Sequence, residues 1–181
     1  KSGKINYYCL QTFEKGHVIT YATHLKVKKA NKEYSTAEKS FHLKLRQGET
    51  ACFTKYFAVY TSRHMNYKRV KNTAIKALRK NTALGFDRLF KENANTWRKL
   101  WDAANIRIKG DATAEKSLRF NIYHLLIAGS RDDDQVSIGA RTLSGEGYRG
   151  HVFWDTEIFM LPFFIYTNPV VAKNLLMYRY N

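Results

Sequence analysis

The sequence predicts an α+β fold in which an antiparallel sheet comes first and helices follow. Over the first 64 residues, apolar and polar positions alternate with a period of two, as in half-buried strands. From about Met65 the apolar period lengthens to that of a helix. The 181 residues are 44% hydrophobic and contain no run of about 18 consecutive apolar residues, which indicates a globular chain without a membrane span.

The predicted strands lie within residues 1–64. Their alternation is clearest in three stretches: residues 19–27, 41–45 and 53–59. Breaks at Lys15–Gly16 and at Gln47–Gly48 have the composition of turns. Such strands are typical of the end of an antiparallel β-sandwich, and alone they would leave an open sheet edge.

The two cysteines indicate whether the protein works in a reducing or an oxidising compartment. Cys9 and Cys52 both fall in strand-like runs, and one pair in a chain of 181 residues is a weak basis for a disulfide framework. We expect both to be reduced, small apolar core residues of a cytoplasmic protein. The first residues also lack the apolar core of a signal peptide.

The formal net charge of +16 introduces nucleic-acid binding as an alternative. The excess is confined to residues 1–110, with 24 Lys and Arg against 7 Asp and Glu, whereas residues 111–181 hold 7 against 8. The basic residues are scattered singly and in pairs, without a glycine-rich or zinc-type motif to present them to phosphates. A solvated basic face is therefore favoured, and no nucleic-acid partner is expected.

Two helices are predicted directly after the strands. The first begins near Met65 and ends at Gly85, with one apolar face formed by Val70, Ala74, Ile75 and Leu78. The second carries a broad apolar stripe formed by Phe86, Leu89, Phe90, Trp97, Leu100 and Trp101. Core packing of a connecting helix explains this stripe better than a stacking platform for a sugar or a base.

The remaining helices are separated by a long polar loop. Asp111 is placed to cap a third helix, which is apolar nearly all round and which we expect to be buried between layers. The loop covers Arg131 to Arg149, and long loops in compact domains often carry function. A further apolar helix is expected from about Val152 to Tyr166, bent by Pro162, and Asn168–Pro169 then opens another.

The residues best suited to binding a ligand are concentrated in one stretch, residues 139–164, GARTLSGEGYRGHVFWDTEIFMLPFF. A glycine-studded loop here leads directly into a helix whose first turn holds Trp154, Asp155 and Glu157. A sugar site needs such parts, because carboxylates accept hydrogen bonds from sugar hydroxyls and aromatic rings cover the apolar ring faces. Glycines let the backbone come close to a ligand.

This run resembles the signature of glycoside hydrolase family 65, whose members are mostly disaccharide phosphorylases. The resemblance extends to TWRKLWDAANIRIKGD (96–111), LRFNIYHLL (118–126) and NLLMYRYN (174–181). Two departures are visible: Thr142 stands where glycine is expected, and Arg149 where a small residue is common.

The resemblance implies a three-part organisation. Residues 1–64 would be the C-terminal strands of a β-sandwich domain, 65–104 a helical linker, and 105–181 the first helices of an (α/α)6 catalytic barrel. Because the sequence starts at a lysine and stops within a helical pattern, we expect an internal piece of a longer protein, with apolar faces left exposed.

The resemblance also implies roles for individual residues. Trp154 and Asp155 would bind the glucosyl unit whose bond is broken. Arg119 is a second candidate for the same sugar or for phosphate, with a structural ion pair to an acid such as Glu157 as its alternative. His151 and Glu157 would either hold the sugar-binding residues in place without contacting the sugar, or lie at the start of the helix. Glu146 lacks a desolvating environment to make it an acid, and the aspartates at 132–134 lack the spaced oxygen ligands of a metal site.

The implied reaction is inverting phosphorolysis of an α-glucosyl disaccharide, maltose first, to β-glucose 1-phosphate and glucose. Trehalose, kojibiose and nigerose phosphorylases and a trehalose hydrolase share the signature. The catalytic acid and the phosphate loop are expected beyond residue 181, so this piece should be inactive alone. Phosphate is a co-substrate, no cofactor or metal is implied, and a homodimer is one assembly open to the full-length enzyme.

Overall fold

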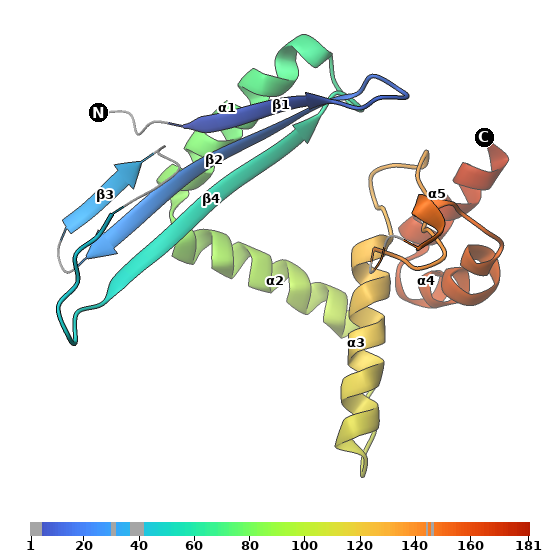
Figure 1. Ribbon diagram of the computed structural model, residues 1–181. Coiled ribbons are helices and arrows are strands. Elements are labelled where there is room, and N and C mark those ends of the chain that lie inside the picture. Colours follow the sequence, from blue (N-terminus) through green and yellow to red (C-terminus); the bar gives the residue numbers. More distant parts are fainter. Residues whose placement is uncertain (1–4, 30–31, 37–41, 144, 146) are drawn as a thin grey trace. The chain divides into compact units, whose positions relative to one another are not determined.

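The computed structural model describes residues 5–29, 32–36, 42–143, 145 and 147–181, and Figure 1 shows the order of its elements. The chain divides into two compact units, Lys1–Asn93 and Ala94–Asn181. An antiparallel sheet precedes the helices, as the change of period predicts. No helix among the described residues is long and apolar enough to cross a membrane.

The sheet of the first unit is built around one long strand, β2 (Val18–Lys29). Strands β1 (Asn6–Gln11) and β3 (Lys32–Thr36) pair with its two halves, and β4 (Ala51–Thr61) pairs along nearly its whole length. All these pairings are antiparallel. Gly16 and Gly48 have positive φ angles of 61° and 84°, so both predicted turns use a backbone conformation that glycine adopts readily.

Helix α1 (Tyr67–Leu84) covers one face of this sheet. Ala22 and Ala58 are paired across β2 and β4, and both are buried together with Ala74 and Leu78 of the helix. The small alanine side chains allow the helix to approach the strands closely. On the opposite face Phe53 and Phe57 are 55% and 62% exposed. The expectation of exposed apolar faces is therefore confirmed for the described residues.

Two expectations for this unit are wrong. Residues 42–46 form no strand. Backbone groups there bind side chains instead: the Lys44 carbonyl accepts from the Lys29 ammonium at 2.7 Å, and the Arg46 N–H donates to Glu49 Oε2 at 2.9 Å. Phe41, which belongs to the same predicted stretch, lies outside the described residues. Cys9 and Cys52 are free but exposed rather than buried, because one is on the edge strand β1 and the other is near the end of β4.

Helix α2 (Phe86–Ala104) contributes its first half to the first unit and its second half to the second. Its stripe is only partly core: Trp97, Leu100 and Trp101 pack beside Ile122 and Leu126 of α3. Phe86 and Phe90 stack on each other with ring centroids 5.9 Å apart and stay exposed.

Helix α3 (Ala112–Ala128) begins as predicted, since Asp111 Oδ1 accepts from the backbone N–H groups of Thr113 at 3.0 Å and Ala114 at 2.9 Å. Its burial on all sides is not observed, because Phe120 and Tyr123 are 62% and 41% exposed. The described residues cover one side of the helix only.

The core of the second unit lies where helices α4 (Leu161–Thr167) and α5 (Pro169–Tyr180) meet the end of α3. Seven residues are buried there: Ile138, Met160, Leu161, Phe164, Val171, Ala172 and Leu175. A Cβ on Gly129 would lie 2.7 Å from Val171 Cγ1 and 2.8 Å from Phe164 Cζ, so only glycine lets α3 end against these helices.

The helix expected from Val152 is shorter and less regular. Residues 151–153 are not helical, and a π-helical turn, η2 (Thr156–Met160), precedes α4. Pro162 has no N–H to donate, and its ring would clash with a carbonyl in a regular helix at this point. In the wider π-helical turn the Leu161 N–H donates to the Thr156 carbonyl. This turn accommodates the proline, so the helix is not simply bent at Pro162 as expected.

Candidate functional site

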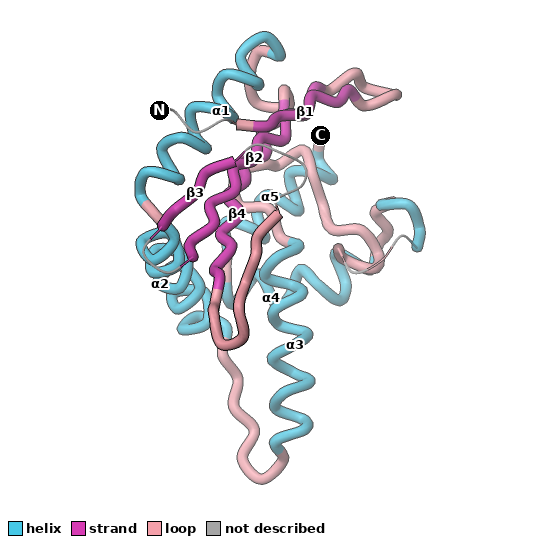
Figure 2. The backbone as a smooth tube through the Cα atoms, turned by 60° about the vertical axis from the view of Figure 1, so that its left-hand side comes forward, coloured by secondary structure: helices cyan, strands magenta, loops and turns pink. Residues whose placement is uncertain are grey.

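The loop between α3 and η2 has an unusual backbone. Figure 2 shows loop over much of this stretch. Thr142, Tyr148 and Arg149 have positive φ angles of 54°, 62° and 49°, and in the described part of the chain no other residue except glycines does. Left-handed backbone is disfavoured for side chains with a Cβ, most of all for a β-branched threonine. The two departures from the family pattern, Thr142 and Arg149, thus stand where glycine would fit most easily.

Trp154 and Asp155 lie where this loop enters the π-helical turn. Trp154 is 62% exposed, and its ring centroid lies 5.8 Å from that of Phe159. Asp155 already has helical backbone angles, φ −52° and ψ −35°, and its side chain makes no capping hydrogen bond. Among the described residues its carboxylate has no hydrogen-bond or ion-pair partner. Both side chains are therefore free to contact a ligand.

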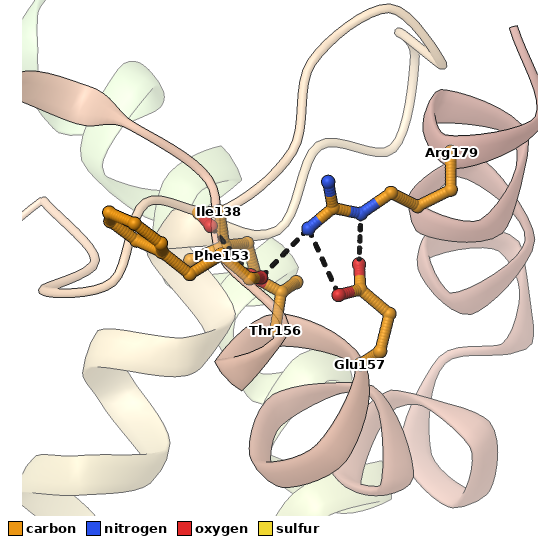
Figure 3. Close-up of polar contacts among 5 residues, drawn as sticks. All are labelled: Ile138, Phe153, Thr156, Glu157 and Arg179. Carbon is orange, nitrogen blue, oxygen red and sulfur yellow. Dashed lines mark hydrogen bonds and ion pairs between the residues drawn. The ribbon is translucent and has the colours of Figure 1, made fainter.

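The next two residues tie the same turn to the rest of the unit. Thr156 is fully buried, and its hydroxyl donates to the Ile138 carbonyl at 2.8 Å. Both carboxylate oxygens of Glu157 accept from Arg179 of α5, Oε1 from Nε at 2.9 Å and Oε2 from Nη2 at 3.1 Å. Figure 3 shows that Nη2 of the same guanidinium also donates to the Phe153 carbonyl, at 2.8 Å.

An open cavity of about 750 Å³ lies between α3, residues 140–142 and η2. Its lining combines aromatic rings and polar side chains, among them Phe120, Asn121, His124, Arg141, Thr142 and Phe159. His124 Nδ1 is buried without a hydrogen-bond partner among the described residues. Apolar walls with a few polar groups suit a sugar-sized ligand. Phe159 is shared by this cavity and the ring contact with Trp154.

The predicted site residues fall in two places. Trp154, Asp155 and Glu157 share the start of η2, and the exposed His151 precedes them, its N–H donating to the Tyr148 carbonyl at 2.9 Å. Within the described ranges no hydrogen bond, ion pair or ring contact joins Arg119 to them. Its Nη1 donates to Asn105 Oδ1 at 3.0 Å, and its guanidinium lies 4.8 Å from the centroid of the Trp101 ring.

The alternative role expected for Arg119, an ion pair with an acid such as Glu157, is therefore corrected. Its partner is Asn105, and the acid Glu157 pairs with Arg179 instead. The hydrogen bond to Glu157 raises the pKa of Arg179 above its usual value. Glu146 lies outside the described residues. In the described ranges no group of three or more His, Cys, Asp or Glu is arranged to hold a metal, and Asp133 accepts from the Gln135 N–H at 2.9 Å.

Sequence reasoning missed Arg179, Asn174, Asn121 and His124. Asn174 Nδ2 donates to the carbonyls of Ser130 at 3.3 Å and Arg131 at 3.0 Å. A usable signal was present, because Asn121 and His124 are three residues apart on one helix face, and three-residue spacing brings side chains together. Arg179 gave no local signal, since its partners are 22 and 26 residues away.

Comparisons with known proteins match both parts of the chain. Residues 2–100 match the glycosyl hydrolase family 65 N-terminal domain, and residues 119–181 match the central catalytic domain of the same family.

Individual relatives agree with this match. The chain is 41% identical over 177 residues to kojibiose phosphorylase of Thermoanaerobacter brockii, covering 98% of the chain and 22% of that protein. It is 44% identical over 141 residues to nigerose phosphorylase of Lachnoclostridium phytofermentans, covering 77% and 18%. Among solved structures it is similar to a candidate kojibiose phosphorylase from the human microbiome, with a TM-score of 0.80, 26% identity, and coverage of 100% and 24%. The chain thus spans about a fifth of the length of these relatives.

Proposed function

Because the chain belongs to glycosyl hydrolase family 65, we propose that it is part of an inverting phosphorylase that cleaves an α-glucosyl disaccharide with phosphate. The observation that carries this proposal is the pair at the start of η2. An exposed Trp154 stands beside an Asp155 carboxylate that has no partner among the described residues. An aromatic face next to an available carboxylate is the minimum that a glucosyl unit needs.

In the proposed mechanism Asp155 accepts hydrogen bonds from hydroxyls of the glucosyl unit, and the Trp154 ring covers an apolar face of the sugar. These contacts hold the anomeric carbon as the ring flattens toward an oxocarbenium-like transition state. Phosphate attacks that carbon from the face opposite the departing sugar. The C–O bond to the leaving sugar breaks, its oxygen takes a proton from a general acid, and β-glucose 1-phosphate forms.

The general acid is assigned to a residue outside this chain. Glu157 is unsuited to the role, because both its carboxylate oxygens already accept from Arg179. Asp155 is unsuited because the proposal uses it as an ionised acceptor. We accordingly expect the chain alone to be inactive, with phosphate as co-substrate and no cofactor. The barrel, the sandwich, the homodimer and the cytoplasmic location expected from the sequence stay part of the proposal.

The substrate proposed first is kojibiose, since relatives named for kojibiose and nigerose match most of the chain. Maltose, which the sequence reading favoured, is not the substrate named for any of these relatives. The test is to assay the full-length enzyme with kojibiose, nigerose, trehalose and maltose, with and without phosphate. We expect β-glucose 1-phosphate from one of them, formed only with phosphate.

Three results would contradict the proposal. Equal glucose release without phosphate would identify a hydrolase of the same family. No turnover of any α-glucosyl disaccharide would remove the proposed activity altogether. Retention on a DNA column that weakens steeply with added salt, in a protein inactive on sugars, would favour the nucleic-acid alternative.

A further inference from the structure

We propose that Arg179 is a positioning residue for the Trp154–Asp155 pair, because it binds the chain on both sides of the pair. This inference rests on the proposed function. Arg179 belongs to α5, and among the described residues it makes no hydrogen bond or ion pair with either of the two site residues. It binds the residue before the pair, through the Phe153 carbonyl, and a residue after it, through the Glu157 carboxylate (Figure 3).

The geometry of the turn explains why two anchors are needed. Phe153 is not helical, whereas Asp155 has helical backbone angles, so the chain changes conformation between these two residues, which flank Trp154. The turn that follows is π-helical, a geometry that is rarer than the α-helix. One guanidinium that binds residues 153 and 157 fixes both sides of this irregular point.

The three hydrogen bonds of Arg179 all come from its one planar guanidinium group. Its Nε and Nη2 bind the two oxygens of Glu157, and Nη2 also serves the Phe153 carbonyl, at distances between 2.8 and 3.1 Å. A guanidinium can do this because its donors are rigidly arranged, whereas the ammonium of lysine is a point charge on a flexible stem. The ion pair also offsets the negative charge of Glu157, which lies two residues from Asp155.

Helix α5 fixes the other end of the loop as well. Asn174, which precedes Arg179 on the same helix, binds the carbonyls of Ser130 and Arg131, where the loop leaves α3. Arg179 binds the carbonyl of Phe153, where the loop ends. Side chains of one helix therefore hold both ends of the loop that delivers Trp154 and Asp155, and all of these contacts lie within the second unit.

The competing explanation is an ion pair that only adds stability. The Arg88–Glu92 pair on α2 represents that case: its Nε–Oε1 distance is 3.0 Å, its side chains are 66% and 57% exposed, and it follows i,i+4 spacing. Such surface pairs contribute little to stability. Arg179 differs because it also binds a backbone carbonyl beside the site, and because Glu157 is only 25% exposed.

The experiment compares variants of the full-length enzyme: Arg179→Met, Arg179→Lys, Glu157→Gln, the double variant Arg179→Met with Glu157→Gln, and Arg88→Met as a matched control. We measure kcat and KM for the disaccharide and, separately, KM for phosphate, with melting temperatures alongside. Arg179→Met should lower kcat/KM for the disaccharide by about ten- to a hundredfold, the range seen when groups that orient active-site residues are removed. KM for phosphate should stay within about twofold of the parent value, because phosphate is held elsewhere.

The other variants sharpen the result. Arg179→Lys should recover only part of the loss, because one ammonium cannot reproduce the rigid set of guanidinium donors. The double variant should lose about as much as Arg179→Met alone, since both changes break one interaction. Arg88→Met should retain parent kinetics.

An active parent combined with an Arg179→Met variant that keeps parent kcat/KM would overturn the positioning role, whatever its melting temperature. Additive losses in the double variant would overturn it too, because Arg179 would then not act through Glu157. If Arg179→Met does not fold, the inference is decided by Arg179→Lys and Glu157→Gln, and parent kinetics in both would reject it. A parent enzyme without phosphorolysis would reject the proposed function, and the inference with it.

Discussion

The two units of this chain hold their backbones in different ways. In the first unit regular strands and α1 enclose apolar side chains such as Ala22, Ala74 and Leu78. In the second, three non-glycine residues take positive φ, a π-helical turn interrupts a helix, and side chains bind several loop carbonyls. Irregular backbone persists only where surrounding contacts hold it, and such places cluster at functional sites. The comparison suggests that stability and site geometry depend on different residues.

The largest effect is expected from Asp155→Ala in the full-length enzyme. Charged hydrogen bonds are worth about 1.5 to 3 kcal/mol each. Losing two to the sugar should lower turnover on the order of a hundredfold or more. The melting temperature should barely change, because Asp155 makes no capping hydrogen bond. Phosphate-dependent sugar release and thermal melting measure the two quantities.

Asp111→Ala is the matched control for that variant. Asp111 does cap α3, through two backbone N–H groups, so its loss should cost about 1 kcal/mol of stability and leave turnover unchanged. An Asp155→Ala enzyme that turns over normally would show that the proposed sugar contact is wrong.

Leu78→Ala tests the other side of the comparison. Leu78 is fully buried between α1 and the sheet, and removing such a side chain costs about 2 to 5 kcal/mol of unfolding free energy. Urea unfolding followed by circular dichroism should show the loss, whereas kcat and KM of the folded enzyme should stay at parent values. Lys76→Ala, on the exposed side of the same helix, should change neither. A drop in kcat for Leu78→Ala would mean that the first unit also shapes the site.

The smallest effect is expected from Thr142→Gly. Left-handed backbone costs a residue with a Cβ about 1 to 2 kcal/mol. Glycine removes that strain but adds freedom to the unfolded chain, worth about 0.4 to 1 kcal/mol in the opposite direction. The variant should therefore be more stable by up to about 1 kcal/mol, seen as a higher melting temperature. Thr142→Ala keeps the Cβ and should show no such gain, and equal melting of the two variants would refute strain at this position.

Local sequence signals predicted the regular parts of the fold. The change of period near Met65 locates the end of the sheet and the start of α1 at Tyr67, and Asp111, Asn168 and Gly85 act at helix ends as their types suggest. These features depend on neighbours within one or two turns, which periodicity and capping rules describe.

Predictions that depend on distant neighbours fared differently. The stretch 41–45 alternates like a strand, but strand formation also depends on where its backbone groups bind, and the Lys44 carbonyl accepts from the side chain of Lys29 rather than from a neighbouring strand. The cysteines alternate correctly but are exposed, one on the edge strand β1 and the other near an end of β4. In the site, Trp154 and Asp155 could be named from their motif, whereas the contact of Arg179 with Phe153 depends on how α5 packs and has no local pattern.

The π-helical turn makes chain length a determinant of this site. Each added residue rotates the following part of an α-helix by about 100°, so a five-residue turn sets α4 in a different rotational register from the one that an uninterrupted α-helix would give. A homologue that lacks one residue between Thr156 and Met160 would need to regularise the helix. Either Asp155 or Phe164 would then turn away from its present surroundings. Single-residue gaps here, which look minor in an alignment, should therefore separate relatives with differently arranged sugar sites.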